Sequence, residues 1–148
     1  MTAREILQTV RTILVVDWPS KDVPESLARA GFEVLVRGGP GPADFSVYEL
    51  KGDSVEARRT GRAPERVDLV YSHRPLSELP RITDLALKLH AKTIWSQSGV
   101  LSNGGKDAKG CWLSPDDLRA SRALVEAAGL TLLHEPYIGD VARELQPA

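Results

Sequence analysis

"TILVVDWPSKDVPESLARAG" (residues 12–31) joins an apolar strand pattern to a helical pattern through a turn that contains no glycine. Its first five residues form an uninterrupted apolar run, which is typical of a strand buried on both faces of a parallel sheet. Val23, Leu27 and Ala30 then share one helical face, and Gly31 stands where it can end the helix. We therefore expect a strand, a turn and a helix, the repeating unit of a parallel α/β sheet.

The same alternation continues along the chain. A short helix is expected before residue 12, and the tail from residue 135 has a mixed pattern that favours no element. The other expected strands are FEVLV (32–36), VDLVYSH (67–73), KTIWSQ (92–97) and LTLLH (130–134), with helices over 79–89 and 115–128. Because βαβ units are right-handed and place their strands in parallel, we predict a three-layer, Rossmann-like α/β domain over residues 1–148, with a mainly parallel five-stranded sheet.

One segment interrupts this alternation. SVYEL (46–50) and SVEAR (54–58) flank the turn signal KGD (51–53), so residues 46–59 could form an extra β-hairpin. The arginines in and after this segment could contact a phosphate of a ligand. The favoured interpretation is that they lie on a solvent-exposed face, because runs of charged residues are usually exposed to solvent. These arginines are Arg58, Arg59, Arg62 and Arg66.

Composition narrows the classes of function. The 148 residues carry a formal net charge of −1, so nothing predicts a surface for nucleic acid. Cys111 is the only cysteine, which excludes an internal disulfide and a thiolate metal cluster and fits a cytoplasmic location. The first ten residues lack the pattern of a secretory signal, and the apolar runs are too short to span a membrane.

A ligand site can be predicted from topology alone. Open parallel sheets bind ligands outside the carboxyl ends of their strands, where the strand order reverses. The segments that follow four of the expected strands therefore form the candidate rim. From them we select Asp17, Trp18, Ser20, Lys21, Arg37, Gly38, His73, Arg74, Pro75, Gln97, Gly99 and Val100 as ligand-contacting residues, with no metal ligand and no catalytic residue among them.

The chemistry of the first turn is uneven. Ser20, Lys21 and the free N–H groups of the following helix could receive a phosphate. Asp17 instead places a carboxylate where a pyrophosphate would lie, and it is more typical of a cap than of a ribose contact. Trp18 could stack on an adenine, but packing over the turn is the favoured interpretation. The glycine fingerprint G-x-G-x-x-G is absent, which argues against a dinucleotide bound in the usual way.

Four stretches of the chain resemble one known family. They are EILQTVRTILVV (5–16), VDLVYSHRP with LPRITDLAL (67–75, 79–87), AKTIWSQSGV (91–100) and LVEAAGLTLL (124–133). The most specific is a Trp-x-Gln-x-Gly pattern, matched by Trp95, Gln97 and Gly99. The chain thus resembles the small stand-alone CoA-binding domain proteins, which are related to the CoA-binding domain of the succinyl-CoA synthetase alpha subunit.

This resemblance implies a Rossmann fold that binds CoA or an acyl-CoA without an established reaction. The residues that carry over are Arg74, Pro75, Gln97, Gly99 and Val100. The chain departs from the family where Asp17 replaces a glycine, where the following loop is several residues shorter, and where RGGPG (37–41) replaces an Asn-Pro turn.

Three alternatives to non-catalytic CoA binding stay open. The first is a degenerate Rossmann domain that has lost its ligand and acts as an interaction or regulatory module, which the short acidic turn motivates. The second is an NAD(P)-dependent enzyme, against which the missing glycine fingerprint argues. The third is an acyl-CoA enzyme, which no evident base, nucleophile or metal set supports. Oligomerisation through a sheet edge or the hairpin is compatible with each of them.

Overall fold

The computed structural model describes residues 2–18, 21–37, 44–97 and 115–146. Helices and strands alternate in these ranges except over residues 33–72, where four strands follow one another. The helices are α1 (Ala3–Thr9), α2 (Asp22–Arg29), α3 (Leu79–Lys88), α4 (Pro115–Ala127) and α5 (Ile138–Leu145), with a 3-10 turn at Leu76–Glu78. The strands are β1 (Thr12–Val16), β2 (Glu33–Arg37), β3 (Phe45–Lys51), β4 (Ser54–Arg59), β5 (Leu69–Ser72), β6 (Thr93–Ser96) and β7 (Thr131–Leu133). None of the helices in these ranges combines the length and the apolar character needed to cross a lipid bilayer.

The strands form one mixed sheet in the order β4-β3-β2-β1-β5-β6-β7. Five of them, β2, β1, β5, β6 and β7, pair in parallel, whereas β3 pairs antiparallel with both β2 and β4. The α/β class and the hairpin expected over residues 46–59 are therefore confirmed. The sheet is not limited to the five predicted strands, because the hairpin joins it and gives seven strands in the described residues. The hairpin continues the sheet because it covers the outer edge of β2, which would otherwise expose unpaired backbone groups.

The hairpin itself follows from its turn. Lys51 pairs with Ser54, which leaves Gly52 and Asp53 as a two-residue loop. Gly52 has a φ of 63°, the left-handed conformation that glycine supplies at the first position of such loops. The sequence signal KGD therefore marks a genuine reversal of the chain.

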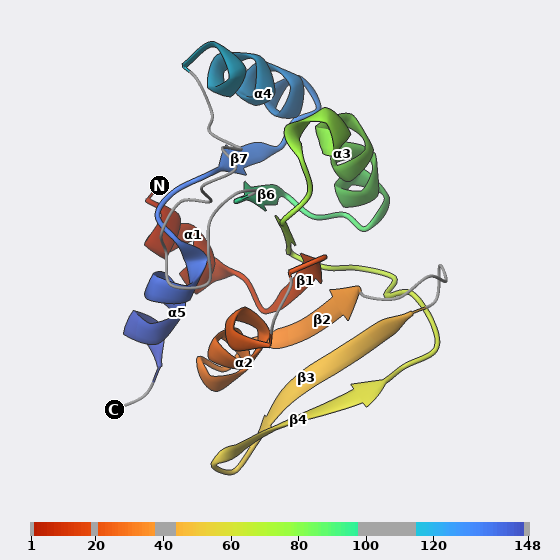
Figure 1. Ribbon diagram of the computed structural model, residues 1–148, viewed down its shortest axis with the longest axis vertical. Coiled ribbons are helices and arrows are strands. Elements are labelled where there is room, and N and C mark those ends of the chain that lie inside the picture. Colours follow the sequence, from red (N-terminus) through yellow and green to blue (C-terminus); the bar gives the residue numbers. More distant parts are fainter. Residues whose placement is uncertain (1, 19–20, 38–43, 98–114, 147–148) are drawn as a thin grey trace.

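Helices cover both faces of the sheet, as Figure 1 shows: α1, α2 and α5 lie on one side, and α3 and α4 lie on the other. The alternation of side chains along β1 explains this arrangement. Ile13 and Val15 pack into the core under α2 and α5, whereas Leu14 and Val16 pack into the core under α3. All four are buried, which is the pattern of a central strand in a covered parallel sheet.

Candidate functional site

The strand order reverses beside β1. The chain leaves β1 through α2 to β2 on one side, and it later returns to β5 on the other side of β1. Val16 and Ser72 are paired at the carboxyl ends of β1 and β5, so the turns that follow them lie next to each other. This is the position at which open α/β sheets bind ligands. We call these two turns, together with Gln97 after β6, the switch-point edge.

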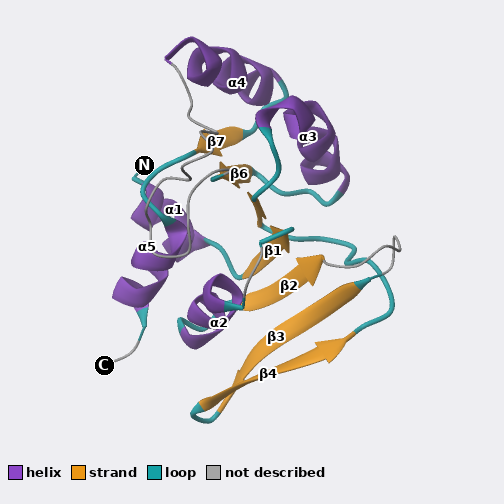
Figure 2. Cartoon of the chain, viewed as in Figure 1, coloured by secondary structure: helices purple, strands orange, loops and turns teal. Residues whose placement is uncertain are grey.

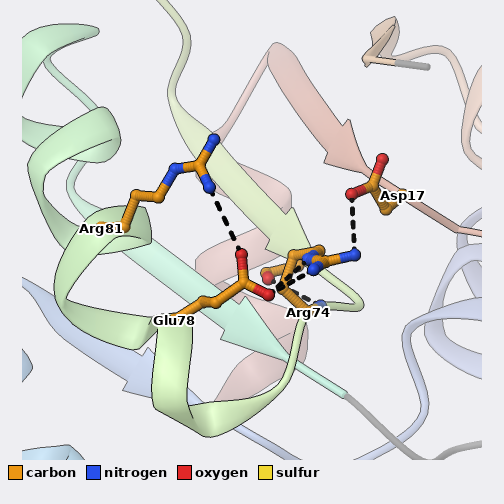
Figure 3. Close-up of polar contacts among 5 residues, drawn as sticks. Asp17, Arg74, Glu78 and Arg81 are labelled. Atoms are coloured by element: carbon orange, nitrogen blue, oxygen red, sulfur yellow. Dashed lines mark hydrogen bonds and ion pairs between the residues drawn. The ribbon is translucent and has the colours of Figure 1, made fainter. Parts of the chain in front are cut away.

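Asp17 begins the turn after β1 in a conformation that suits glycine. Its φ of 58° lies in the left-handed region, which costs a residue with a Cβ roughly 1–2 kcal/mol, although Asp tolerates it better than most. Its carboxylate reaches Arg74, with Oδ2 and Nη1 3.3 Å apart (Figure 3). The turn therefore keeps a glycine-like backbone but adds a negative charge that spans the point of strand reversal.

Arg74 lies between two carboxylates. Its guanidinium pairs with Asp17 on one side and with Glu78 on the other, where Nε and Oε2 are 2.9 Å apart. Glu78 also lies 3.6 Å from Arg81, so a chain of four alternating charges runs along this edge (Figure 3). The hydrogen bond with Glu78 is the main cause that raises the pKa of Arg74, and the same bond lowers the pKa of Glu78. Arg74 is thus a fixed cation whose charge is already compensated.

Trp18 fills the space beside the ion-pair chain. Its side chain is 7% exposed, and its indole Nε1 donates a hydrogen bond to the Asp22 carboxylate over 2.6 Å. The ring meets His73 and Tyr71 edge-on, at centroid distances of 4.8 and 5.7 Å, and lies 6.0 Å from Tyr137. These contacts place the indole within the core rather than on a surface open to an adenine.

Gln97 is buried and its amide group is fully used. Oε1 accepts from the Tyr71 hydroxyl and from the Ile138 amide, both over 3.0 Å. Nε2 donates to the carbonyl groups of His134 and Pro136, over 3.0 and 2.9 Å. A side-chain amide offers two donors and one carbonyl oxygen with two lone pairs, so no capacity is left for a ligand. Gln97 joins the end of β6 to the segment that precedes α5.

Two tyrosines belong to the same buried network. Burial raises the pKa of Tyr71 above its ordinary range. Burial, and secondly the negative charge of Asp22, raises the pKa of Tyr137 to about 12. Both phenols therefore stay protonated at neutral pH, and the Tyr71 hydroxyl remains a donor to Gln97.

Two other predicted residues bring positive charge to this edge. Lys21 is exposed and is the N-cap residue of α2, and Arg37 is half-buried at the end of β2. Neither side chain makes a hydrogen bond or ion pair with another residue in the described ranges. The first turn of α2 already contains Asp22 and Glu25, whose negative charges interact favourably with the positive end of the helix dipole. Pro24, in the same turn, has no N–H group to donate to a ligand. A phosphate would therefore meet a weaker helix terminus than the sequence predicts.

The remaining predicted residues divide into two groups. Pro75 is exposed and precedes the 3-10 turn that leads into α3, and His73 is half-buried with Nδ1 3.2 Å from the Gln97 carbonyl oxygen. Ser20, Gly38, Gly99 and Val100 lie outside the described residues. Among the residues that are described, no group of three or more His, Cys, Asp or Glu side chains could hold a metal ion.

Sequence reasoning missed the partners that fix this edge. Asp22 and Glu78 each follow a selected residue, Trp18 and Arg74, by four positions, a spacing that could have suggested contact. Tyr71 gave no such signal, because its partner Gln97 lies 26 residues further along the chain.

Comparison with known proteins shows the fold alone. No family model matches the chain, and no curated protein matches it. Prb, a PH1109 protein redesigned for binding, superposes with a TM-score of 0.61 at 16% identity, over 96% of this chain and 88% of its own. The protein called cell-free ID.343 from Thermus thermophilus gives a TM-score of 0.59 at 19% identity, over 96% and 95%. The chain thus shares its α/β fold with both of these structures.

Proposed function

We propose that the chain is a single Rossmann-like domain that binds CoA or an acyl-CoA, without catalysis, at the switch-point edge. The observation that carries this proposal is the reversal of strand order between β2-β1 and β1-β5, at which nucleotide ligands bind in open α/β sheets. The helices on both faces of the parallel strands support the three-layer assignment.

The cations at this edge give the ligand a means of recognition. Lys21, Arg37 and Arg74 each follow or end a strand at this edge, and the phosphates of CoA carry the complementary charge. To reach Arg74, a ligand phosphate displaces the Asp17 carboxylate, because both compete for the same guanidinium. Trp18 fills the space in which a glycine-rich turn would wrap a pyrophosphate, so the ligand lies over the turn rather than inside it.

A second candidate is a domain that has lost its ligand and serves as an interaction or regulatory module. The specific observation in its favour is that two of the polar side chains at the switch-point edge already have partners within the chain. The Gln97 amide has no capacity left, and Arg74 is shared between Asp17 and Glu78. This candidate predicts no affinity for CoA, even when Asp17 is neutralised.

Calorimetric titration of CoA into three variants and the natural chain tests the proposal. We expect Arg74→Gln to weaken CoA binding about tenfold or more, because a charge-assisted contact is lost. Asp17→Asn should tighten binding several-fold, because the competing carboxylate is gone while the side-chain shape is kept. Arg81→Gln is the matched control: it removes the same charge at the far end of the ion-pair chain and should leave affinity unchanged.

Native mass spectrometry of freshly purified protein adds an independent readout. A retained mass that matches CoA supports the proposal directly. If neither the natural chain nor Asp17→Asn gives heat with CoA or acetyl-CoA, the CoA proposal is wrong and the ligand-free candidate replaces it.

A further inference from the structure

β4 lies at the outer edge of the sheet, and no strand pairs with its far side among the described residues (Figure 2). The side chains from Ser54 to Arg59 are exposed, apart from the half-buried Val55. An edge strand presents unpaired N–H and C=O groups to which another strand can be added. We call β4 and its unpaired backbone groups the hairpin edge.

The register of the hairpin determines which groups face outward. The Thr60 amide donates to the Phe45 carbonyl over 3.0 Å, so these two residues form a hydrogen-bonded pair with β3. Antiparallel strands alternate hydrogen-bonded and non-bonded pairs, so every second residue of β4 points its backbone groups away from β3. The outward-facing residues are Val55, Ala57 and Arg59.

One charged side chain on β4 lacks a partner of opposite sign among the described residues. Glu56 is directly opposite Glu49 of β3, a pairing of like charges that destabilises a sheet. Glu49 is compensated by Arg58 at 3.2 Å and by Lys51 at 3.7 Å. The Glu56 side chain makes no ion pair or hydrogen bond with any residue in the described ranges. A cation on the side of Glu56 that faces away from β3 would therefore reduce the repulsion between Glu56 and Glu49.

We propose that β4 pairs antiparallel with β4 of a second copy of the chain, with Ala57 opposite the partner's Ala57. In this register every outward-facing residue of one strand lies opposite an outward-facing residue of the other, since Val55 is then opposite the partner's Arg59. All of the outward-facing N–H and C=O groups can therefore form hydrogen bonds between the two strands. This register also places Glu56 opposite the partner's Arg58, and two-fold symmetry repeats that pair. The strand is thus complementary in charge to its own reversed copy.

The charges also exclude the neighbouring registers. A shift of the symmetry centre by one residue preserves the match of outward backbone groups but places Glu56 opposite the partner's Glu56, or Arg58 opposite the partner's Arg58. Like charges directly opposite each other destabilise a strand pair. The sequence Glu56-Ala57-Arg58 therefore favours one register and one kind of occupant, a second copy of this chain.

Sedimentation velocity of the full chain over a concentration series to about 1 mM tests this pairing. The natural chain should associate to a dimer. Ala57→Pro should abolish the association, because proline removes an N–H that faces outward and that β3 does not use. Circular dichroism shows whether this variant keeps its fold.

A charge exchange provides a test that does not depend on proline. Glu56→Arg and Arg58→Glu should each weaken dimerisation roughly tenfold or more, because each converts two attractive pairs into two repulsive pairs. An equimolar mixture of the two variants should recover the dimer, since opposite charges then face each other again.

Several outcomes would overturn the pairing. These are a natural chain that stays monomeric at every concentration, a dimer that survives Ala57→Pro and both charge variants, or a mixture of the folded charge variants that does not associate.

Discussion

The switch-point edge and the hairpin edge treat their polar groups in opposite ways. At the switch-point edge, Gln97 is buried with all its hydrogen bonds made, and Trp18 donates to Asp22 from within the core. At the hairpin edge, Glu56 stands opposite Glu49 in the open. The comparison shows that the edge at which α/β sheets usually bind ligands can hold residues that stabilise the fold, while a surface strand leaves backbone groups unpaired in the described part of the chain.

The largest expected effect comes from Trp18→Ala. Removal of the indole leaves a cavity and takes away one hydrogen-bond donor to Asp22, which should lower the free energy of unfolding by about 3–5 kcal/mol. Urea denaturation measures the change. Leu50→Ala on the hairpin is the matched control, because this leucine is 39% exposed and should cost well under about 1 kcal/mol. Equal losses at the two positions would show that the regions do not differ as described.

Gln97→Ala should have the next largest effect. It leaves the Ile138 amide, the Tyr71 hydroxyl and the His134 carbonyl oxygen without their buried partner, at a cost of about 2–4 kcal/mol. The Pro136 carbonyl oxygen keeps the hydrogen bond that Trp95 Nε1 donates. The control on the hairpin edge is Glu56→Ala, which should change the free energy of unfolding by less than about 0.5 kcal/mol. A neutral Gln97→Ala would mean that water replaces the side chain, and the switch-point edge would then be open to ligands.

The smallest expected effect is a pH dependence from His134. Burial is the main cause that lowers the pKa of His134 below 6.5 in the folded chain, and its Nδ1 is buried without a hydrogen-bond partner in the described structure. The unfolded chain therefore binds a proton at His134 before the folded chain does, so stability is complete above pH 6.5 and falls as the pH drops through the folded pKa.

Denaturation at about pH 7.5 and about pH 5.5 measures this loss, and His134→Gln should reduce it. Val55→Gln on the hairpin edge should leave the pH dependence as it is in the natural chain. If His134→Gln does not alter the loss, other groups cause the acid sensitivity.

The sequence predicts the repeating parts of this fold well, because they depend on local patterns. The apolar run 12–16 and the helical face of Val23 and Leu27 appear as β1 and α2, and Gly52 reverses the chain as expected. That the hairpin joins the parallel strands in one sheet could not be predicted in this way, because the pairing of β3 with β2 depends on an edge that only the assembled sheet presents.

The candidate site was harder to predict, because its contacts join distant segments. Gln97 looks like part of a ligand-facing turn, yet its partners lie 37–41 residues further along the chain, near a tail to which no element was assigned. Ile138, Val141 and Leu145 have helical spacing, so a signal for α5 was present, but it was short and followed Pro136. The hydrogen-bond partners of a buried amide are a property of the fold and not of a motif.

Because Arg74 already forms an ion pair with Asp17, an anion that binds Arg74 must exchange with the Asp17 carboxylate. An uncompensated arginine that captures an anion forms a new ion pair, and dissolved salt weakens that capture strongly. An anion that replaces Asp17 at 3.3 Å from Arg74 leaves the number of ion pairs unchanged. Salt then weakens the Asp17–Arg74 pair that is lost and the anion–Arg74 pair that is formed to a similar extent. In the proposed complex, the Asp17 carboxylate should therefore weaken the dependence of anion binding at Arg74 on ionic strength, and it should also lower the affinity.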